Sequence, residues 1–386
     1  MRSFDVAVVG AGPAGSTAAM RLAEGHDVAL IEEHQRPGVP VQCAGLITPR
    51  GVPEFAAGCI LSTVRGARIH SPLGHVLTLE GRGPKAHVVD RAVFDRILFE
   101  RAVDRGAVPM LGTKVLSASQ GNGSATLCLK GDSESMSLSS PVVVGADGYR
   151  SVCRKASGLP PARHMLTGIQ VDLKGADHDL DFVDLYLGNE VAPGFFAWAI
   201  PGPDFLRVGL CTWRSDEAPA AYLKRLLARP EFASGHKISS SSGRIPVGPG
   251  KRAVSGSIVL IGDAACHAKP LSGGGVFTGI RGAELCATVV DRYLRDSGSV
   301  TLDEFDRLWM PEFGRELAKA LRIRKVFVAL SDKRMDKALR MFDDPSVRRL
   351  LEDRGDIDYP ASLSSSVLKL VPKLAQFSPE LIESLL

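Results

Sequence analysis

The sequence has no apolar run of the roughly 18 residues that a membrane-spanning helix needs. The apolar stretch that follows Arg2 is interrupted by Asp5 and Pro13, so it is not typical of a secretory signal. The seven cysteines contain no CxxC or other metal-like spacing, and an odd number cannot all pair. We therefore expect free thiols, no metal site, and a cytoplasmic protein whose contact with membranes is at most peripheral.

A strong charge of either sign is also missing. Lys and Arg number 47 against 43 Asp and Glu, which leaves a net charge of +4. This excess is too small to indicate a nucleic-acid partner. Hydrophobic residues at 45% and charged residues at 23% exclude a disordered or fibrous chain. The 386 residues are enough for two or three structural units with a sizeable core.

The first 32 residues predict a strand, a turn, a helix and a second strand. Residues 5–9 are apolar on both faces, as a buried parallel strand must be, and residues 28–31 repeat that character. The Ala-rich segment 14–23 between them is predicted to be a helix, which Gly25 ends. This order is typical of the start of a nucleotide-binding α/β unit.

The turn between that strand and helix carries the pattern GxGxxG, formed by Gly10, Gly12 and Gly15. Gly10 permits the tight turn, Gly12 lets the backbone approach a pyrophosphate at the positive helix terminus, and Gly15 lets the helix pack closely on the strand. Glu32 ends the second strand, where its carboxylate would accept hydrogen bonds from ribose hydroxyls. Together these residues predict dinucleotide binding.

Two more junctions between a strand and a glycine turn occur far downstream, at 142–148 and 258–262, which indicates one nucleotide-binding domain interrupted by another. Between them, period-two segments such as 184–187 and 195–200 indicate a largely antiparallel sheet, and the pattern after about 301 is helical. The predicted fold class is α/β: a Rossmann-type domain interrupted by an antiparallel-sheet substrate domain, plus a C-terminal helical region. The predicted boundaries are 1–57, 86–162 and 250–300 for the nucleotide-binding domain, 58–85 and 163–249 for the substrate-binding sheet, and 301–386 for the helical region.

The two downstream junctions identify the dinucleotide by resemblance. The segments that begin at Asp147 and Gly262 resemble the DG and GD fingerprints of the FAD-dependent hydroxylase superfamily, in the same order along the chain. The resemblance implies an FAD-binding domain in which Asp263 holds the ribityl chain. It also implies that glycines 273–275 lie beside the flavin ring, where the helix from Val276 would stabilise negative charge on the reduced flavin through its dipole.

Within that superfamily, about the first 300 residues more closely resemble the geranylgeranyl reductases. The matching segments are 40–45, 90–95, 185–188 and 192–201. The last resembles the family's aromatic-x-Trp-x-Phe-Pro signature, except that Ile200 stands where the family usually has Phe. The resemblance implies an FAD-dependent reductase that saturates the double bonds of geranylgeranyl chains in membrane-lipid precursors such as digeranylgeranylglycerophospholipid.

By the same resemblance, Cys43 is expected near the flavin ring, as the proton donor or the residue that orients one; an inert loop cysteine is the alternative. The residues expected to bind FAD, from the motifs and the resemblance together, are Gly10, Gly12, Ala14, Gly15, Glu32, Cys43, Ala44, Gly45, Arg91, Asp147, Asp263, Gly274, Gly275 and Val276. The residues expected to line the prenyl pocket are Tyr186, Phe196, Trp198 and Pro201.

Strand alternation divides the side chains of 195–200 between two faces. Phe196, Trp198 and Ile200 are expected on one face, and Phe195 with two alanines on the other. The bulky face is expected to line a slot for a long apolar chain, with plain core packing as the alternative.

An isolated alkene accepts a hydride only if a proton reaches the other alkene carbon, so the reaction needs a dry pocket and a placed acid. Because the chain has a single GxGxxG, the electrons are expected from a transiently bound NAD(P)H or from a partner such as ferredoxin. Two other functions stay open. One is an FAD-dependent monooxygenase or halogenase, because 196–201 partly resembles the halogenase WxWxIP signature. The other is a flavin-only electron-transfer protein.

A basic segment lies in the C-terminal helical region. Residues 315–340 contain nine basic and three acidic side chains, with apolar residues interleaved. We expect this segment, including Arg322, Arg324 and Lys325, to lie on the surface and to meet either a membrane or an acidic electron donor. A solvated basic face without a partner is the alternative.

Overall fold

A six-stranded sheet carries the three glycine-rich turns. The computed structural model describes residues 2–372, apart from 122, 132–134, 249 and 297–298, so residues 373–386 of the predicted helical region lie outside the described residues. The strand order is β19-β20-β13-β2-β3-β9, and only β19 runs antiparallel to its neighbour. The strands are β2 (Val6–Val9), β3 (Val28–Ile31), β9 (Val108–Met110), β13 (Val142–Gly145), β19 (Val254–Ser255) and β20 (Ile258–Leu260).

The order of the strands explains why the turns meet. Every residue of β2 and β3 is buried, because helices and a second sheet cover this sheet. The strands that precede the three glycine turns, β2, β13 and β20, are adjacent and parallel. Parallel neighbours end at the same edge of a sheet, so the three turns lie together there. The predicted strand, helix and strand at the start of the chain are confirmed, with α1 at Pro13–Leu22.

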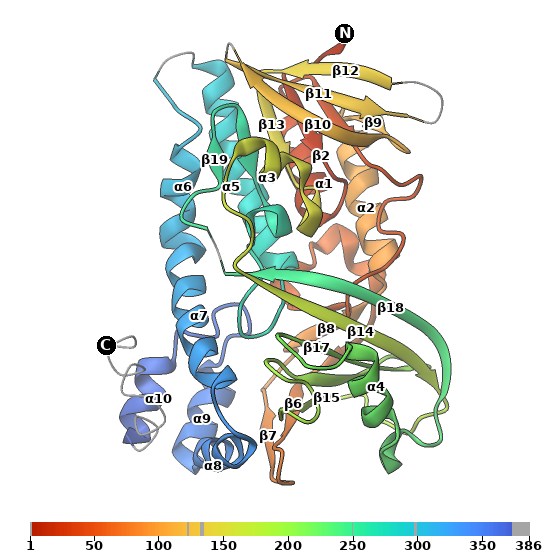
Figure 1. The fold of residues 1–386 in the computed structure, drawn as a ribbon, viewed down its shortest axis with the longest axis vertical. Helices are drawn as coiled ribbons and strands as arrows, with labels where there is room; N and C mark the ends of the chain where they lie inside the picture. The colour runs from red at the N-terminus through yellow and green to blue at the C-terminus, as the bar shows by residue number, and fades with distance from the viewer. Residues whose placement is uncertain (1, 122, 132–134, 249, 297–298, 373–386) are drawn as a thin grey trace.

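Helices and a smaller sheet surround this sheet (Figure 1). Helix α1 packs against both α2 (Arg91–Asp104) and α5 (Val276–Arg295), and α3 (Val152–Ser157) packs against β10. The four-stranded sheet β1-β12-β11-β10 was not predicted, because serines in its strands weaken the period-two hydrophobic signal. Its strands are β1 (Arg2–Ser3), β10 (Lys114–Gly121), β11 (Ser124–Lys130) and β12 (Ser135–Ser140). Short 3₁₀ helices are η1 (Pro49–Gly51), η2 (Glu54–Cys59), η3 (Gly148–Arg150), η4 (Pro230–Phe232) and η5 (Gly262–Ala265).

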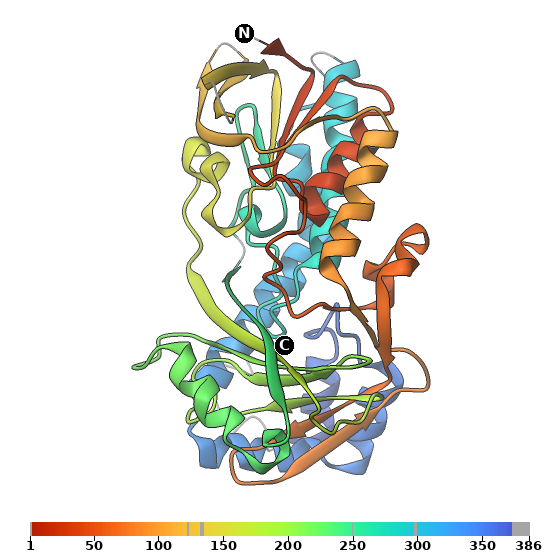
Figure 2. The same cartoon turned by 90° about the vertical axis from the view of Figure 1, so that its right-hand side faces the viewer.

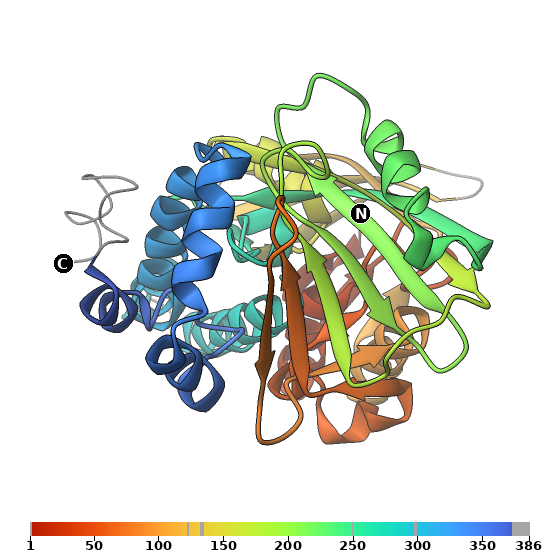
Figure 3. The same cartoon turned by 90° about the horizontal axis from the view of Figure 1, so that it is seen from below.

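A seven-stranded sheet forms the second part of the molecule (Figures 1 and 3). Its order is β18-β14-β17-β16-β15-β6-β7, and its neighbours are antiparallel except for β15 and β6. Helix α4 (Pro219–Leu227) packs on one face. The strands are β6 (Gly66–His70), β7 (Val76–Glu80), β14 (His164–Lys174), β15 (Phe182–Tyr186), β16 (Ala197–Pro201), β17 (Leu206–Thr212) and β18 (His236–Val247). The chain passes between the two parts through a small sheet of β4 (Leu46–Ile47), β8 (Ala86–Val89) and β5 (Ile60–Val64).

The two faces of the seven-stranded sheet meet different surroundings. Ala197 and Ala199 point towards α4 and share a buried cluster with Tyr186. Trp198 and Ile200 point to the other face and share an apolar cluster with residues of the nucleotide-binding part. The predicted alternation is therefore confirmed for these four residues of β16. We call the second group, which includes Ala268, the interdomain cluster.

Phe195 departs from the predicted alternation. Phe195 and Phe196 both belong to the interdomain cluster, and their ring centroids lie 4.1 Å apart in a stacked arrangement. The expectation that Phe195 points to the opposite face was wrong. Both rings precede β16 and follow Gly194, whose φ is +73°, so the alternation of an extended strand does not apply to them.

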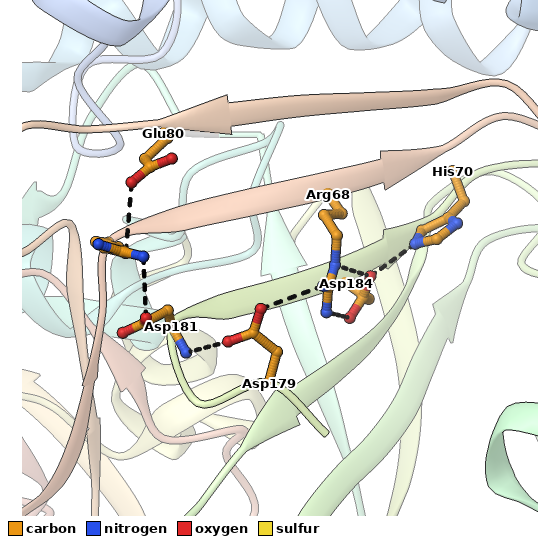
Figure 4. Close-up of polar contacts among 7 residues, drawn as sticks. Arg68, His70, Glu80, Asp179, Asp181 and Asp184 are labelled. Atoms are coloured by element: carbon orange, nitrogen blue, oxygen red, sulfur yellow. Dashed lines mark hydrogen bonds and ion pairs between the residues drawn. The ribbon is translucent and has the colours of Figure 1, made fainter. Parts of the chain in front are cut away.

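An ion network joins the parallel strands β6 and β15 (Figure 4). Arg68 donates to both carboxylate oxygens of Asp184 at 2.8 Å, and His70 Nε2 lies 2.7 Å from Asp184 Oδ1. Burial alone would raise the pKa of Asp184, but hydrogen bonds from His70 and Arg68 hold that pKa below its ordinary value. Asp184 pairs across the sheet with Ala199 and so lies on the α4 face. The network therefore fastens two strands and stands apart from the interdomain cluster.

The helices after residue 301 run along one side of both parts (Figures 1 and 2). Trp309 and Phe313 belong to the core of the nucleotide-binding part, and Trp309 stacks on the buried His267 at 3.8 Å between centroids. Helices α8 and α9 pack against β7 of the other part. Among the described helices, none combines the length and the apolar character needed to cross a membrane. The elements are α6 (Glu304–Trp309), the π-helical turn η6 (Met310–Gly314), α7 (Arg315–Val328), α8 (Asp332–Phe342), α9 (Pro345–Arg354) and α10 (Ser364–Leu370).

A group of three charges, two of them buried, fastens this C-terminal region to the third glycine turn. Lys269 Nζ donates to Asp358 Oδ1 at 2.7 Å, and Arg50 Nη2 donates to Asp358 Oδ2 at 2.9 Å. Asp358 is fully buried, and Lys269 is 4% exposed. Burial lowers the pKa of Lys269, and Asp358 opposes that shift. Asp358 is thus the counter-ion of two cations, one of them buried.

We predict that Asp358→Ala lowers the free energy of unfolding by about 3–5 kcal/mol, because it leaves the buried Lys269 without a counter-ion. Asp356→Ala is the matched control, since Asp356 also pairs with Arg50 but is 31% exposed, and should cost less than about 1 kcal/mol. Urea titration measures both. Equal losses for the two variants would show that burial of the Lys269–Asp358 pair does not matter.

Candidate functional site

The first glycine turn is packed so tightly that two of its glycines have no substitute. A Cβ atom at Gly15 would lie 1.8 Å from the carbonyl oxygen of Gly10. Gly10 has a φ of +95°, and a Cβ there would lie 2.5 Å from the Ala146 oxygen. In contrast, no atom of the described residues lies within 4 Å of a Cβ placed on Gly12. The backbone at Gly12 therefore borders open space at the start of α1, where a phosphate can approach.

Ala14 brings the first and third turns together. Its Cβ lies 3.1 Å from the position of a Cβ on Gly262 and 3.5 Å from that on Gly279. Residues of the first turn of α1 thus pack directly on the GD segment and on α5. A larger side chain than alanine would push these elements apart.

The carboxylate of Glu32 closes the other side of the first turn. Glu32 Oε2 accepts a hydrogen bond from the Ala11 amide at 2.9 Å, and Oε1 accepts one from the His34 amide at 3.0 Å. The Glu32 side chain is 12% exposed. It is therefore fixed at the end of β3 beside the glycine turn, as a ribose-binding acid would need to be.

The carboxylate of Asp263 has no hydrogen-bonding partner within the part of the chain that the structure describes. Among the described residues no side chain or amide donates to its carboxylate, and only burial and Arg91 affect its titration. Burial raises the pKa of Asp263 to about 6, and Arg91 opposes that shift. The Oδ1 atom lies 3.3 Å from the position of a Cβ on Gly275, just before α5. Such a carboxylate is suited to accept hydrogen bonds from ligand hydroxyls.

Asp147 has a different role in the structure from Asp263. Its carboxylate accepts hydrogen bonds from the hydroxyl of Ser151 at 2.5 Å and from the amides of Val152 and Cys153 at 2.6 and 3.1 Å. It therefore holds the start of α3. The Cα atom of Asp147 lies 3.1 Å from the position of a Cβ on Gly10, so the backbone of the DG segment, rather than the carboxylate, borders the first turn.

The third glycine turn is shaped by Lys269. Gly273 donates to the Lys269 oxygen at 2.8 Å, and Lys269 donates from its amide to the Gly274 oxygen at 3.0 Å. A Cβ at Gly274 would lie 3.1 Å from Lys269 Cε, so the buried lysine side chain lies directly against this backbone. Gly275 precedes Val276 and α5 without any side-chain cap, which leaves the first amides of this helix for a ligand.

The segment from Cys43 to Gly45 lies between the two parts of the molecule. The carbonyl oxygen of Cys43 accepts a hydrogen bond from Gln170 Nε2 at 3.0 Å, and that of Ala44 accepts one from Arg207 Nη1 at 2.9 Å. The Gly45 oxygen accepts one from the Val89 amide. Three successive carbonyls are thus held from three strands, which fixes the backbone at Cys43.

Arg91 links Cys43 to the acid of the GD segment. Arg91 donates to both oxygens of Asp95 at 3.0 Å. Burial alone would lower the pKa of Arg91, but Asp95 and then the Cys43 sulfur raise it above its ordinary value. Because Arg91 also acts on Asp263, the structure brings Cys43, Arg91 and Asp263 together from three distant segments.

A row of side chains crosses the seven-stranded sheet beside Cys43. Gln170, Gly209 and Trp198 are direct neighbours on β14, β17 and β16. Gln170 Oε1 and Trp198 Nε1 are both buried without a hydrogen-bonding partner among the described residues. The row continues into Leu185 on β15, which is apolar. This face therefore offers two unsatisfied polar atoms next to an apolar surface.

The four residues expected in the prenyl pocket do not share one face. Phe196 and Trp198 belong to the interdomain cluster. Tyr186 lies on the α4 face, where its ring stacks on His70 at 4.6 Å between centroids. Pro201 also points away from the interdomain cluster, because it lies an odd number of residues from Trp198 along β16.

The expectation that Arg324 lies on the surface was wrong. It is 3% exposed and donates to the carbonyl oxygens of Gly194 at 2.6 Å and Pro270 at 3.4 Å. Helical periodicity turns Arg324 inwards while Arg322 and Lys325 on the same helix are exposed. Lys269 was not among the residues predicted from the sequence, although it directly precedes Pro270 within the GD fingerprint.

Comparison with known proteins agrees with this geometry. Residues 3–226 match a family model described as FAD binding domain. The chain is 32% identical to an uncharacterized protein of Methanocaldococcus jannaschii, with 95% of each chain covered. It is 30% identical to a digeranylgeranylglycerophospholipid reductase of Methanothrix thermoacetophila, covering 90% of this chain and 93% of that one.

Two solved structures show the fold. A geranylgeranyl bacteriochlorophyll reductase-like protein of Thermoplasma acidophilum superposes with a TM-score of 0.83 at 23% identity, covering 97% of this chain and all of that one. A flavin-dependent brominase superposes with a TM-score of 0.75 at 17% identity, covering 97% of this chain and all of that one. The residues described above fit FAD, because Gly12 borders open space and Asp263 presents an unpartnered carboxylate to it.

The raised pKa of Asp263 leads us to predict that FAD binding depends on pH. Hydroxyl donors of the bound cofactor would stabilise the ionised carboxylate and lower its pKa from about 6 in the free protein. The FAD affinity should therefore be constant above about pH 6 and fall as the pH drops below it. Flavin fluorescence quenching measures the affinity. Asp263→Asn should bind FAD more weakly at pH 8 and lose this pH dependence, whereas full flavin content in Asp263→Ala would show that the carboxylate holds no ribityl hydroxyl.

Proposed function

Because this chain belongs to the family of the archaeal digeranylgeranylglycerophospholipid reductases and carries its FAD-binding domain, we propose that it is an FAD-dependent reductase of prenyl lipids. It would saturate the double bonds of geranylgeranyl chains in membrane-lipid precursors. The observation that supports the proposal best is the placement of Cys43 and Arg91 between the GD acid and the apolar face of the sheet.

The glycine turns and Asp263 would hold the cofactor. Gly12 would receive the pyrophosphate, Glu32 the ribose hydroxyls and Asp263 the ribityl chain, in accord with the space and the free acceptors at these positions. The uncapped start of α5 would lie beside the ring, with the buried Lys269 against the same turn. FAD, when bound and reduced by the electron donor, would supply the hydride that one alkene carbon accepts.

The interdomain cluster would exclude water from the alkene. Phe195, Ile200 and Trp198 are each less than one tenth exposed, and the cluster closes on Ala268 of the GD segment. Water molecules and charged groups are unfavourable in apolar surroundings. A proton can therefore reach the alkene only from a donor that the protein holds in place. A chain of isoprene units has the shape and polarity that this surface accepts.

Cys43 is the candidate proton donor. Its sulfur accepts a hydrogen bond from the Gly45 amide at 3.4 Å and contacts Arg91, so the thiol has a defined position. Cys43 is half-buried, and its carbonyl oxygen is hydrogen-bonded to Gln170, which lies in the same row as Trp198. We propose that this thiol gives its proton to the alkene carbon opposite the one that accepts hydride, or orients the group that does.

The reaction consumes a reductant, for which we propose NAD(P)H or ferredoxin. Because the substrate is a lipid, we also propose peripheral contact with the membrane. Arg315 and Arg322 on α7 support such a contact, since both are exposed, and basic side chains are attracted to anionic lipid surfaces.

An anaerobic experiment separates this function from the alternatives. Photoreduced protein mixed with a prenyl lipid should regain the absorbance of oxidised flavin without oxygen. A monooxygenase or halogenase would stay reduced until oxygen is admitted. A flavin-only electron carrier would be reoxidised by an added electron acceptor but not by the lipid. Persistence of the reduced spectrum with lipid alone would therefore contradict the proposal.

We predict that Cys43→Ala keeps its FAD but slows anaerobic reoxidation by saturating lipid by about a hundredfold, because proton donation contributes about that much or more. Cys128→Ala, which changes another half-buried cysteine far from the turns, is the control and should react as the wild type does. Stopped-flow absorbance measures the rate. An unchanged rate in Cys43→Ala would rule out the thiol as the acid.

A further inference from the structure

Trp213 lies at the centre of a group of cationic side chains. The Arg214 guanidinium lies 4.4 Å from its ring centroid and the Arg324 guanidinium 5.8 Å, while the His164 ring meets it edge-on at 5.1 Å. These residues come from β14, from the loop after β17 and from α7. We call them, together with Arg163 and Lys325, the Trp213 cation group.

The group has no matching acids. Arg163, Arg214 and Lys325 are exposed and make no ion pair with any carboxylate among the residues the structure describes. Besides burial, four cations lower the pKa of His164, namely Arg324, Lys325, Arg214 and Arg163. Neighbouring arginines differ in this respect: Arg225, for example, pairs with Glu217 at 2.9 Å. An unmatched group of cations is suited to bind an anion.

Arg214 is also held in an unusual backbone conformation. Its φ is +53°, and the only other non-glycine residue with a positive φ in the described part of the chain is Cys266, in the GD segment. Side chains other than glycine are disfavoured there, so surrounding contacts must hold the residue in place. The Trp213 oxygen packs 2.7 Å from the position of a Cβ on Gly194, which fixes this loop against the turn that carries Phe195.

A series of aromatic rings leads from this group into the interdomain cluster. Arg324 lies 5.2 Å from the ring of Phe195, which also packs over Gly273 of the third glycine turn. Phe195 stacks on Phe196 at 4.1 Å, and Phe196 meets Trp198 edge-on at 6.3 Å. Positive charge lies at one end of this row of rings, and the row itself is apolar and leads towards Cys43. This arrangement matches a molecule with an anionic head and a long apolar chain.

We infer that the Trp213 cation group binds the phosphate of the prenyl lipid, while the chain lies along Phe195, Phe196 and Trp198. This inference rests on the proposed function and adds to it the residues that would hold the phosphate of the head group. Guanidinium groups suit this task because they present several N–H donors in a plane that matches phosphate oxygens. Arg324 is buried and already held by two carbonyls, so the exposed Arg214 and Lys325 would make the direct contacts.

The test compares two lipids and two double variants in anaerobic single turnovers that start from photoreduced protein. The lipids are digeranylgeranylglyceryl phosphate and digeranylgeranylglycerol, which differ only in the phosphate. The variant R214Q/K325Q removes two exposed cations of the group. The control R2Q/K130Q removes one arginine and one lysine that are exposed on the four-stranded sheet.

For R214Q/K325Q we expect the half-saturating concentration of the phosphorylated lipid to rise by about tenfold or more, since a hydrogen bond to a charged group is worth that factor. The value for digeranylgeranylglycerol should not change, and the control should behave as the wild type with both lipids. Inorganic phosphate should compete with the phosphorylated lipid in the wild type and in the control, but not in R214Q/K325Q. Flavin content and the thermal unfolding midpoint, measured alongside, should be equal in all proteins.

Four results would overturn the inference. Equal losses of affinity for both lipids would show that the group acts on the prenyl chain or on the fold of the protein. A loss confined to flavin reduction by NADPH, measured separately, would assign the group to the phosphate of a nicotinamide donor. A wild type that reduces both lipids with the same half-saturating concentration would show that no phosphate site exists while the proposed function stands. If the wild type reduces neither lipid, the proposed function itself fails, and this inference fails with it.

Discussion

The rest of the site depends on the close backbone contact between helix α1 and the first glycine turn. Helix α1 approaches the first turn so closely that a Cβ on Gly15 would lie 1.8 Å from the Gly10 oxygen, and the Ala146 oxygen blocks a side chain on Gly10 itself. Only bare backbone allows three parallel strands to bring their turns to one edge of the sheet. The free space at Gly12 and the unpartnered carboxylate of Asp263 exist because no side chain fills that edge.

The parts of the molecule that depend on local pattern could be predicted from the sequence. Apolar runs bounded by glycines gave the ranges of β2, β3 and α1 nearly to the residue, because burial on both faces leaves a clear signal. The alternation in β16 correctly separated Trp198 from Ala199. The FAD family followed from two short fingerprints, and the comparisons agree with it.

Features that depend on contacts between distant segments could not be predicted. A basic run gave no sign that Arg324 turns inwards to the carbonyls of Gly194 and Pro270, since that depends on which face of α7 packs on the protein. The role of Lys269 depends on its buried ion pair with Asp358, which lies 89 residues later in the sequence, so no local pattern indicates it. The face on which Tyr186 lies was equally hidden, because it is set by strand register, which a family signature does not record.

The proposed function requires this site to saturate a prenyl chain with electrons that the bound flavin carries. The most direct measurement is mass spectrometry of the lipid after an anaerobic single turnover with photoreduced protein, together with the amount of flavin reoxidised. We expect the lipid to gain two hydrogen atoms for each flavin that is reoxidised. A lipid of unchanged mass beside reoxidised flavin, or a gain of oxygen once air is admitted, would contradict it.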